Sequence, residues 1–325
     1  MRTFLSITAA LLLLASVAHP QPAADFHQHL FSPADHQRAP QVQAFFARDL
    51  IPLLDAAGVH RAVILSLAYQ YGNPNLPSIE DEYTKVKAEN DWTAQQVGLY
   101  PGRLWAFCSV NPLKDYALEE IARCARDPIL RTGLKMHFGN SDVDLDNPQH
   151  VAKLRDVFRA ANQHRMAIVV HMRSSVTRKR PYGTKEAHVF LEQLLPAAPD
   201  VTIQIAHLAG SGTFDDPTVD QALSVFIEAI ARHDPRMKNV YFDISGVAGF
   251  GDWQPKKQLI ATRIRQIGMN RILWGSDSSY GGLTPVETLK AYQALPLTRE
   301  EFHAIDTNIP PYLQRGTIAP SPPHL

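Results

Sequence analysis

The sequence predicts a single α/β domain, a closed (β/α)8 barrel that covers residues 24–309. Eight short apolar runs, rich in β-branched or aromatic residues, recur along the chain, and segments with helical periodicity separate them in units of roughly 30–40 residues. Strands that alternate with helices form a parallel sheet covered on both faces. An open doubly wound sheet would carry a Gly-rich turn after its first strand, whereas Leu30-Phe31-Ser32-Pro33 follows it here, so the sequence favours the barrel.

The expected elements follow in chain order. The strands are residues 24–30, 61–68, 104–110, 132–138, 167–172, 201–208, 240–246 and 271–278. Helical periodicity is clearest at residues 42–57, 116–126, 150–163 and 219–232. A final barrel helix is expected at residues 284–295, and Thr298 with Glu301 forms a capping box that opens a further short helix. The proline-rich tail at residues 310–325 is expected to be extended or disordered.

The N-terminus predicts export. Arg2 precedes an apolar run at residues 4–17, and Ser16-Val17-Ala18 is a small-x-small pattern suited to signal-peptidase cleavage. The run is short for a membrane span. Residues 1–18 are therefore predicted to be a signal peptide, and the mature protein is expected to be periplasmic or secreted, with no membrane association after cleavage.

The composition limits the kinds of partner. The 325 residues are 45% hydrophobic and 20% charged, which is typical of a globular protein. Lys+Arg and Asp+Glu are both 32, so the chain lacks the excess of basic residues that nucleic acid or an anionic membrane would attract. We expect a small-molecule substrate as the partner, and homodimer formation stays an open expectation. Cys108 and Cys124 either pair in an oxidising compartment or stay as buried free thiols.

Polar residues gather where the expected strands end, which in a barrel is the edge that carries the active site. They are His27 and His29 on the first strand, Lys135 and His137 on the fourth, His171 on the fifth, His207 on the sixth, Asp243 in the seventh and Asp277 at the end of the eighth. Residues two apart on a strand share a face, so His27 and His29 can both point into the barrel mouth. Because neutral imidazoles are typical ligands of zinc and its first-row neighbours, the whole set indicates a metal site, although each histidine alone would also suit a core position.

With these residues, the sequence resembles the amidohydrolase superfamily. Within that superfamily it is similar to the amidohydrolase-related group, which includes aminocarboxymuconate-semialdehyde decarboxylase, aromatic-acid decarboxylases, hydrolases and lactonases. The resemblance rests on Asp25-x-His27-x-His29, Gly133-Leu134-Lys135-Met136-His137, His171, His207 and Trp274-Gly275-Ser276-Asp277, in family order along nearly the whole mature chain. It implies that the catalytic metal is bound by His27, His29, His171 and Asp277. It also implies that His207 is a catalytic or second-metal histidine. Zinc is the expected ion, with one ion per chain and a second as the alternative.

The role of Lys135 stays open. In binuclear members of the superfamily a fourth-strand lysine is carboxylated and bridges two metals, whereas one metal is usual in the related group. Lys135 and His137 share a face by strand alternation, so both are also candidates for contact with the substrate. Relatives often carry Tyr-Pro after the eighth-strand aspartate, where this chain has Ser278 and Ser279, and this departure affects the substrate pocket.

The expected chemistry is hydrolysis by a metal-activated water. A divalent metal lowers the pKa of a bound water to about 7. Asp277 would take the proton of that water and return it to the leaving group, and His207 would polarise a carbonyl or stabilise an oxyanion. Arg173, close to His171, is expected to hold a substrate carboxylate by paired hydrogen bonds.

Loop residues complete the expected substrate site. Tyr69 and Tyr71, after the second strand, would form an aromatic wall. Arg178, Lys179 and Arg180 make the fifth-strand loop basic, which is more typical of a solvated loop than of a binding site.

Three function classes follow. The first is an exported hydrolase of a C–N, ester or lactone bond in a small molecule. The alternative is a non-oxidative decarboxylase of a small aromatic or unsaturated carboxylic acid. A catalytically silent binding protein is the third, and the complete set of ligand-type residues disfavours it.

Overall fold

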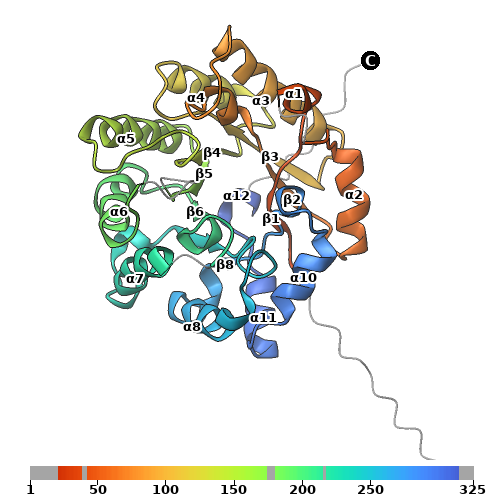
Figure 1. The fold of residues 1–325 in the computed structure, drawn as a ribbon, viewed down its shortest axis with the longest axis vertical. Helices are drawn as coiled ribbons and strands as arrows, with labels where there is room; N and C mark the ends of the chain where they lie inside the picture. The colour runs from red at the N-terminus through yellow and green to blue at the C-terminus, as the bar shows by residue number, and fades with distance from the viewer. Residues whose placement is uncertain (1–20, 39–41, 174–179, 215–216, 315–325) are drawn as a thin grey trace, which may run out of the picture.

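The predicted barrel is confirmed by the computed structural model, which describes residues 21–38, 42–173, 180–214 and 217–314. Eight parallel strands form one sheet in the order β1 to β8 (Figure 1). The strands are β1 (Asp25–Gln28), β2 (Ala62–Leu65), β3 (Leu104–Ser109), β4 (Gly133–His137), β5 (Ala167–His171), β6 (Ile203–Ile205), β7 (Val240–Asp243) and β8 (Ile272–Leu273). Each strand pairs with the next one along the chain, as expected from right-handed crossovers through helices.

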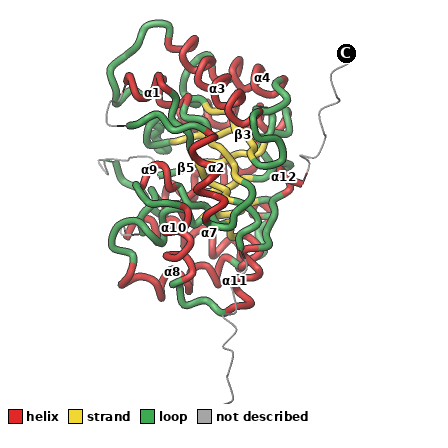
Figure 2. The backbone as a smooth tube through the Cα atoms, turned by 90° about the vertical axis from the view of Figure 1, so that its right-hand side faces the viewer, coloured by secondary structure: helices red, strands yellow, loops and turns green. Residues whose placement is uncertain are grey.

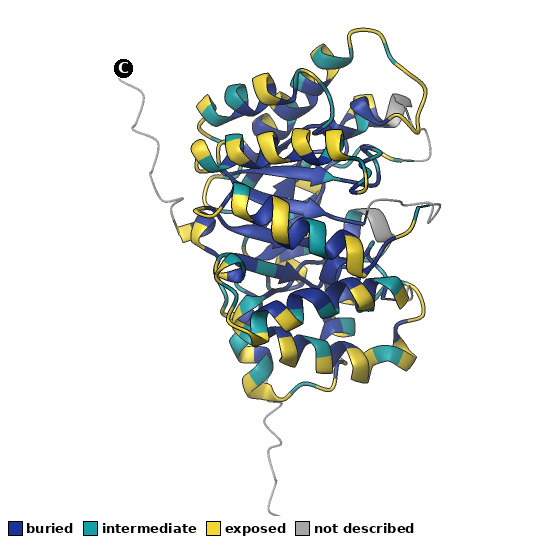
Figure 3. Ribbon diagram, turned by 90° about the vertical axis from the view of Figure 1, so that its left-hand side faces the viewer, coloured by how far each residue is buried: buried dark blue, intermediate teal, exposed yellow. Residues whose placement is uncertain are grey.

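Helices surround the sheet, with their exposed faces outward and the strands buried inside (Figure 3). They are α1 (Pro33–Arg38), α2 (Ala47–Ala56), α3 (Glu82–Gly98), α4 (Ala117–Arg126), α5 (Pro148–Gln163), α6 (Thr184–Val189), α7 (Pro217–Ala231), α8 (Lys257–Ile267), α9 (Ser278–Gly281), α10 (Pro285–Gln293), α11 (Arg299–Asp306) and α12 (Pro311–Gln314). The capping box of Thr298 and Glu301 is present at the start of α11. In the described part of the chain, no helix combines the length and apolar character that a membrane crossing requires.

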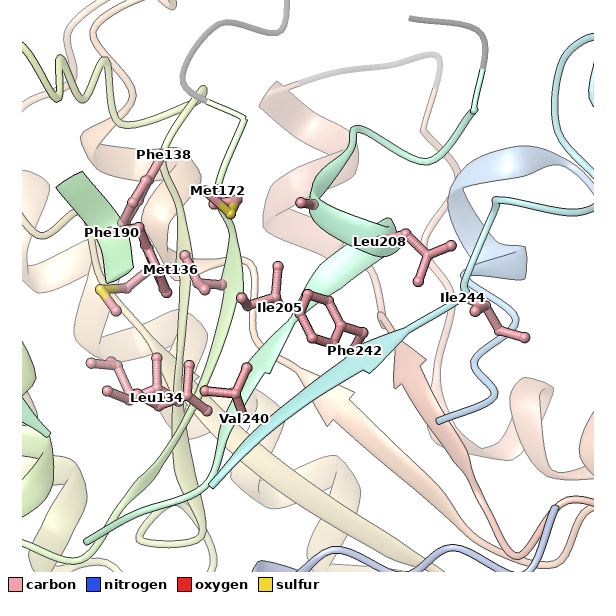
Figure 4. Close-up of a cluster of buried hydrophobic side chains, with 14 of the residues drawn as sticks. Leu134, Met136, Phe138, Met172, Phe190, Ile205, Leu208, Val240, Phe242 and Ile244 are labelled. Carbon is pink, nitrogen blue, oxygen red and sulfur yellow. The ribbon is translucent and has the colours of Figure 1, made fainter. Parts of the chain in front are cut away.

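Strand alternation divides the apolar residues into two layers. Leu134, Met136 and Phe242 belong to the layer between strands and helices, where Figure 4 shows them packed with neighbours from adjacent strands and Phe190. The other face of the strands fills the barrel interior, with Val63, Phe107 and Val169 among its apolar residues. Lys135 and Asp243 lie one residue away from outward-facing neighbours and are therefore directed into the same interior.

The seam between β8 and β1 closes the ring. The backbone N–H of Phe26 donates to Trp274 O at 3.0 Å, and that of Asp277 donates to His27 O at 2.9 Å. The carboxylate of Asp25 joins the same seam, because it accepts from the backbone N–H and the hydroxyl of Ser276 at 2.9 and 2.5 Å. The sequence predicted that these strands meet, and the structure adds the buried carboxylate that ties them together.

The helix α12 fills the barrel end opposite the C-terminal ends of the strands. Figure 2 places α9, which follows β8, and α12 on opposite sides of the molecule, and Figure 1 places α12 near the centre of the ring. Tyr312 and Leu313 are buried in the interior apolar layer. The expectation of an extended or disordered tail was therefore wrong for residues 311–314, because two apolar side chains here gain a buried site; residues 315–325 lie outside the described residues.

The expected strands are longer than the observed ones. The largest difference is at β8, which was predicted to span residues 271–278 but contains only Ile272–Leu273. The strand β6 was predicted to reach residue 208 but ends at Ile205, because His207, Leu208 and Ala209 adopt positive φ angles of 56°, 49° and 69°. The predicted signal peptide at residues 1–18 and the loop residues Arg178 and Lys179 lie outside the described residues. Cys108 and Cys124 are buried free thiols, as one of the two alternatives expected.

Replacing Gly275 with alanine tests the seam. A Cβ at this position would lie 2.8 Å from His27 Cβ and 3.0 Å from His27 N, so β1 would have to move. We expect Gly275→Ala to lower the free energy of unfolding by about 1–3 kcal/mol, measured by chemical denaturation. The control is Gly98→Ala on the exposed end of α3, where the new Cβ meets only the flexible Cδ1 of Ile129 at 3.1 Å. Equal stability losses in the two variants would contradict the tight seam.

Candidate metal centre

The structure brings the strand-end histidines of the prediction together. The ring of His27 has its centroid 5.3 Å from that of His29 and 4.7 Å from that of His207. The ring of His171 lies 5.1 Å from that of His207 and stacks on His137 at 3.8 Å. These five side chains come from β1 and the residue that follows it, from β4 and β5, and from the turn after β6, so the barrel assembles residues that are far apart in sequence.

Three of the histidines are fixed by a hydrogen bond from Nδ1 to an oxygen that can only accept. Nδ1 of His27 donates to Asp243 Oδ2 at 3.0 Å, Nδ1 of His29 donates to Leu65 O at 2.7 Å, and Nδ1 of His207 donates to Ser245 O at 2.7 Å. In each neutral ring the proton is therefore on Nδ1 and the lone pair is on Nε2. This tautomer is the one that presents Nε2 to a metal or to a transferable proton.

Burial keeps these rings neutral. Burial lowers the pKa of His27 to about 3, and it lowers the pKa of His29 well below the ordinary value. Burial also lowers the pKa of His207. Uncharged imidazoles are the form that binds a cation, so the environment favours ligation over protonation.

The carboxylate of Asp243 is fully hydrogen-bonded. Its Oδ2 accepts from His27 Nδ1 at 3.0 Å and from Gln204 Nε2 at 2.7 Å. Its Oδ1 accepts from the backbone N–H of His207 at 2.9 Å and from the N–H and hydroxyl of Ser245 at 3.2 and 2.5 Å. Burial acts to raise the pKa of this carboxyl, but the contacts with His27 and His207 hold it below its ordinary value.

Asp277 is the opposite case. Its Oδ1 is buried without a hydrogen-bond partner among the described residues and lies 3.8 Å from His29 Nε2. Burial raises the pKa of this carboxyl well above its ordinary value. A buried carboxylate oxygen that lacks a donor is costly unless a cation or a proton completes it.

Two groups of side chains have the spacing of a metal site, His27 with His29 and Asp277, and His27 with His207 and Asp243. The oxygens of Asp243 are already occupied by donors, whereas Asp277 Oδ1 has no hydrogen-bond partner among the described residues and lies 3.8 Å from His29 Nε2. The first group therefore fits a divalent metal better than the second. His171, the fourth ligand that the resemblance implies, lies outside both groups, and its buried Nδ1 has no hydrogen-bond partner in the described ranges.

Lys135 also reaches this centre. Its Nζ lies 3.3 Å from Nε2 of His27, and burial lowers the pKa of the amine to about 8. His137, two residues along the same strand, accepts the backbone N–H of Asn140 at its Nδ1, at 3.1 Å. Its Nε2 therefore carries the proton in the neutral ring and is a donor.

Tyr69 lies beside the histidine cluster, and Arg173 follows the end of β5. Arg173 is buried, with its guanidinium carbon 5.1 Å from the centre of the Tyr182 ring. The ring of Tyr69 lies 5.3 Å from that of His137. Tyr69 and Tyr71, expected to form one aromatic wall, belong to different apolar clusters, and Tyr71 packs with Val86.

Arg180, in the described part of the basic loop, is held by the loop after β4. Arg180 pairs with the carboxylate of Asp142 at 2.6 Å and donates to the carbonyls of Asp142 and Val143. This arginine therefore ties the loop after β5 to the loop after β4.

Sequence reasoning placed Asp243 at this rim without a role and missed Gln204 and Ser245. Asp243 is joined to His27 across 216 residues of sequence, a separation that no local pattern encodes. A signal was present in strand alternation, which puts the polar Gln204 inside an otherwise apolar β6. The left-handed backbone at His207, Leu208 and Ala209 was also unexpected.

A family model described as amidohydrolase matches residues 24–306. The chain belongs to this family. The family is metal-dependent, in agreement with the donor groups at the barrel mouth. A search of curated proteins gives no match.

Solved structures of other proteins share the fold. A 2,6-dihydroxybenzoate decarboxylase in complex with 2,6-dihydroxybenzoate has a TM-score of 0.62 at 16% identity, over 91% of this chain and 98% of its own. A probable 2-pyrone-4,6-dicarboxylic acid hydrolase from Acinetobacter baumannii, with citric acid bound, has a TM-score of 0.56 at 18% identity, over 87% and 95%. An amidohydrolase from Burkholderia multivorans with bound zinc has a TM-score of 0.56 at 12% identity, over 88% and 96%.

Asp243→Asn tests the hydrogen-bonded carboxylate. The amide would place an NH2 group against the donors on one side of the carboxylate, so at least one donor would be left unpaired. We expect a loss of about 3–5 kcal/mol in the free energy of unfolding and a roughly 10–100-fold weaker affinity for zinc, measured by competition with a chromophoric chelator. The control is Asp306→Asn, a buried carboxylate that accepts from Tyr292 at 3.0 Å. An Asp243→Asn protein indistinguishable from this control would refute the role of Asp243.

Proposed function

We propose that the protein is a metal-dependent hydrolase that cleaves a C–N, ester or lactone bond in a small carboxylated molecule. The observation that carries the proposal is the group of His27, His29 and Asp277, whose potential metal-binding atoms lie within 4.8 Å of one another, together with a buried Asp277 Oδ1 that has no hydrogen-bond partner among the described residues. This arrangement suits a divalent cation and leaves a carboxylate beside it for proton transfer.

His27, His29, His171 and Asp277 are the residues we assign to the metal, with zinc as the expected ion. A divalent metal at this site would lower the pKa of a bound water to about 7 and polarise a carbonyl. One ion is proposed, because the carboxylate of the second donor group is occupied by hydrogen bonds.

Asp277 and His207 are proposed to move the protons. Asp277 accepts a proton from the attacking water as the new C–O bond forms, and it returns that proton to the leaving atom as the C–N or C–O bond breaks. The Nδ1 proton of His207 is held by Ser245 O, so neutral His207 offers a lone pair at Nε2. His207 is therefore an acceptor in its resting form and becomes a donor to an oxyanion only after it takes up a proton.

The substrate side is proposed to contain Arg173, His137, Lys135 and Tyr69. Arg173 would hold a carboxylate through its paired N–H groups, and Nε2–H of His137 would donate to a neighbouring oxygen. The ring of Tyr69, close to that of His137, suits a flat substrate. The ligands named for the similar structures, a dihydroxybenzoate and citric acid, are carboxylates and support this choice.

Non-oxidative decarboxylation is the second candidate. The similarity to a 2,6-dihydroxybenzoate decarboxylase favours it, and the same site would serve if Asp277 or His207 delivered a proton to the ring carbon that loses CO2. Export, proposed from residues 1–18, favours hydrolysis of imported or extracellular material. Separately, a homodimer is proposed as the assembly.

A substrate panel separates the two reactions. Metal-loaded protein is incubated with lactones, esters and amides that carry a carboxylate, and with hydroxylated benzoates, while acid release and CO2 are both measured. We expect acid release without CO2 from a carboxylated lactone, ester or amide. Release of CO2 alone would transfer the proposal to decarboxylation, and turnover unaffected after chelation of all metal would overturn both.

Asp277→Asn tests the proton-transfer role on whichever substrate turns over. The amide keeps the shape of the side chain but cannot accept the proton, so we expect kcat to fall by at least about 100-fold. Arg173→Gln is the contrasting variant, expected to raise KM for the carboxylated substrate with a smaller change in kcat. Full kcat in Asp277→Asn protein that retains its metal would exclude Asp277 as the base.

A further inference from the structure

A chain of buried polar side chains crosses the barrel interior from α12 to the candidate metal centre. The hydroxyl of Tyr312 lies 2.9 Å from Gln204 Oε1, and Gln204 Nε2 lies 2.7 Å from Asp243 Oδ2. Asp243 Oδ2 in turn accepts from Nδ1 of His27 at 3.0 Å. Gln204 and Asp243 are fully buried and Tyr312 is 8% exposed, so this series of hydrogen-bonded side chains is shielded from water.

The direction of each hydrogen bond follows from its partners. Gln204 Nε2 has two N–H groups, and they donate to Asp243 Oδ2 and to the backbone carbonyl of Phe26 at 3.2 Å. Gln204 Oε1 must therefore accept, and the hydroxyl of Tyr312 must donate. The acceptors Asp243 Oδ2 and Phe26 O thus fix which end of Gln204 faces the site, and the hydroxyl of Tyr312 holds the other end in place. Without that hydroxyl, Gln204 Oε1 would be buried without this donor, and the amide could tilt and change its bond to Asp243.

The same oxygen, Asp243 Oδ2, is shared by Gln204 and His27. A rotation of the carboxylate would change the bond to His27 Nδ1, which sets both the ring orientation and the position of the proton. Tyr312 is itself held by apolar packing against Phe107, with ring centroids 5.2 Å apart. The rigid barrel floor is therefore connected to the orientation of a histidine at the mouth.

We propose that Tyr312 is a positioning residue for the metal centre: from the closed end of the barrel it orients Gln204, which orients Asp243, which holds His27 with Nε2 directed at the metal. The metal part of this inference rests on the proposed function. The segment that holds Tyr312 follows the last barrel helix, so a short appendage outside the (β/α)8 repeat contributes to the site.

Tyr312→Phe removes the hydroxyl and keeps the ring. We expect roughly tenfold weaker zinc binding by the apoprotein in competition with a chromophoric chelator. The matched control is Tyr292→Phe, which removes a buried tyrosine hydroxyl that donates to Asp306 at 3.0 Å, outside this chain of contacts. Its zinc affinity is expected to stay within twofold of the original protein. Equal zinc affinities for the Tyr312→Phe, Tyr292→Phe and original proteins would overturn the proposal.

A double-mutant cycle distinguishes positioning from general destabilisation. Gln204→Met has a similar shape and no amide, so we expect it to weaken zinc binding on its own. Adding Tyr312→Phe to Gln204→Met should then weaken zinc binding little further, because the link is already broken. If the two losses add in full, Tyr312 does not act through Gln204 and the proposal fails. If Tyr312→Phe is poorly stable, the zinc affinity of Gln204→Met alone still tests the contact between Gln204 and Asp243.

A readout without metal separates this inference from the proposed function. In apoprotein with labelled histidine, the Nδ1–H resonance of His27 reports its hydrogen bond to Asp243. We expect Tyr312→Phe to shift or broaden this resonance and Tyr292→Phe to leave it unchanged. If the original protein bound no zinc, the proposed function would fail while this resonance still tested the positioning. An unchanged resonance in Tyr312→Phe would refute it.

Discussion

The site depends on the buried carboxylate of Asp243. A negative charge inside a barrel is costly unless donors surround it, and here two side chains, two backbone N–H groups and one hydroxyl do so. These bonds fix His27 through its ring and His207 through its backbone. The bond from His207 N–H also helps to offset the left-handed backbone at this residue, which costs on the order of 1–3 kcal/mol.

The two buried carboxylates at this centre differ in their hydrogen bonds. Both oxygens of Asp243 accept hydrogen bonds, so this residue holds His27 and His207 in place. Asp277 has an oxygen without a donor among the described residues, so it is available to a cation or a proton. The difference follows from where the two residues lie. Asp243 ends β7, beside Gln204 of β6 and the turn after β6, which both supply donors to it. Asp277 follows the short β8 at the seam with β1, where its own backbone N–H donates to His27 O.

Local patterns predicted the barrel and most of the rim residues, because strand alternation and strand ends are encoded within a few residues. These patterns were enough to name four of them from the sequence, His27, His29, His171 and Asp277. The end of β6 was misplaced, since apolar residues continue to Leu208 while the backbone turns at His207. Gln204 and Tyr312, 108 residues apart, were missed because their meeting depends on how the tail folds back into the barrel.

The contacts that support the proposed metal centre lie apart from the residues proposed to contact the substrate. The supporting contacts, from Tyr312 through Asp243 to His27, run down the barrel interior and would be the same for any substrate. Arg173, Tyr69 and His137 stand on other elements at the mouth, and exchanging them would not break a bond of that interior chain. Because barrel enzymes change reactions through residues at the strand ends, an interior network of this kind is compatible with either of the two proposed reactions.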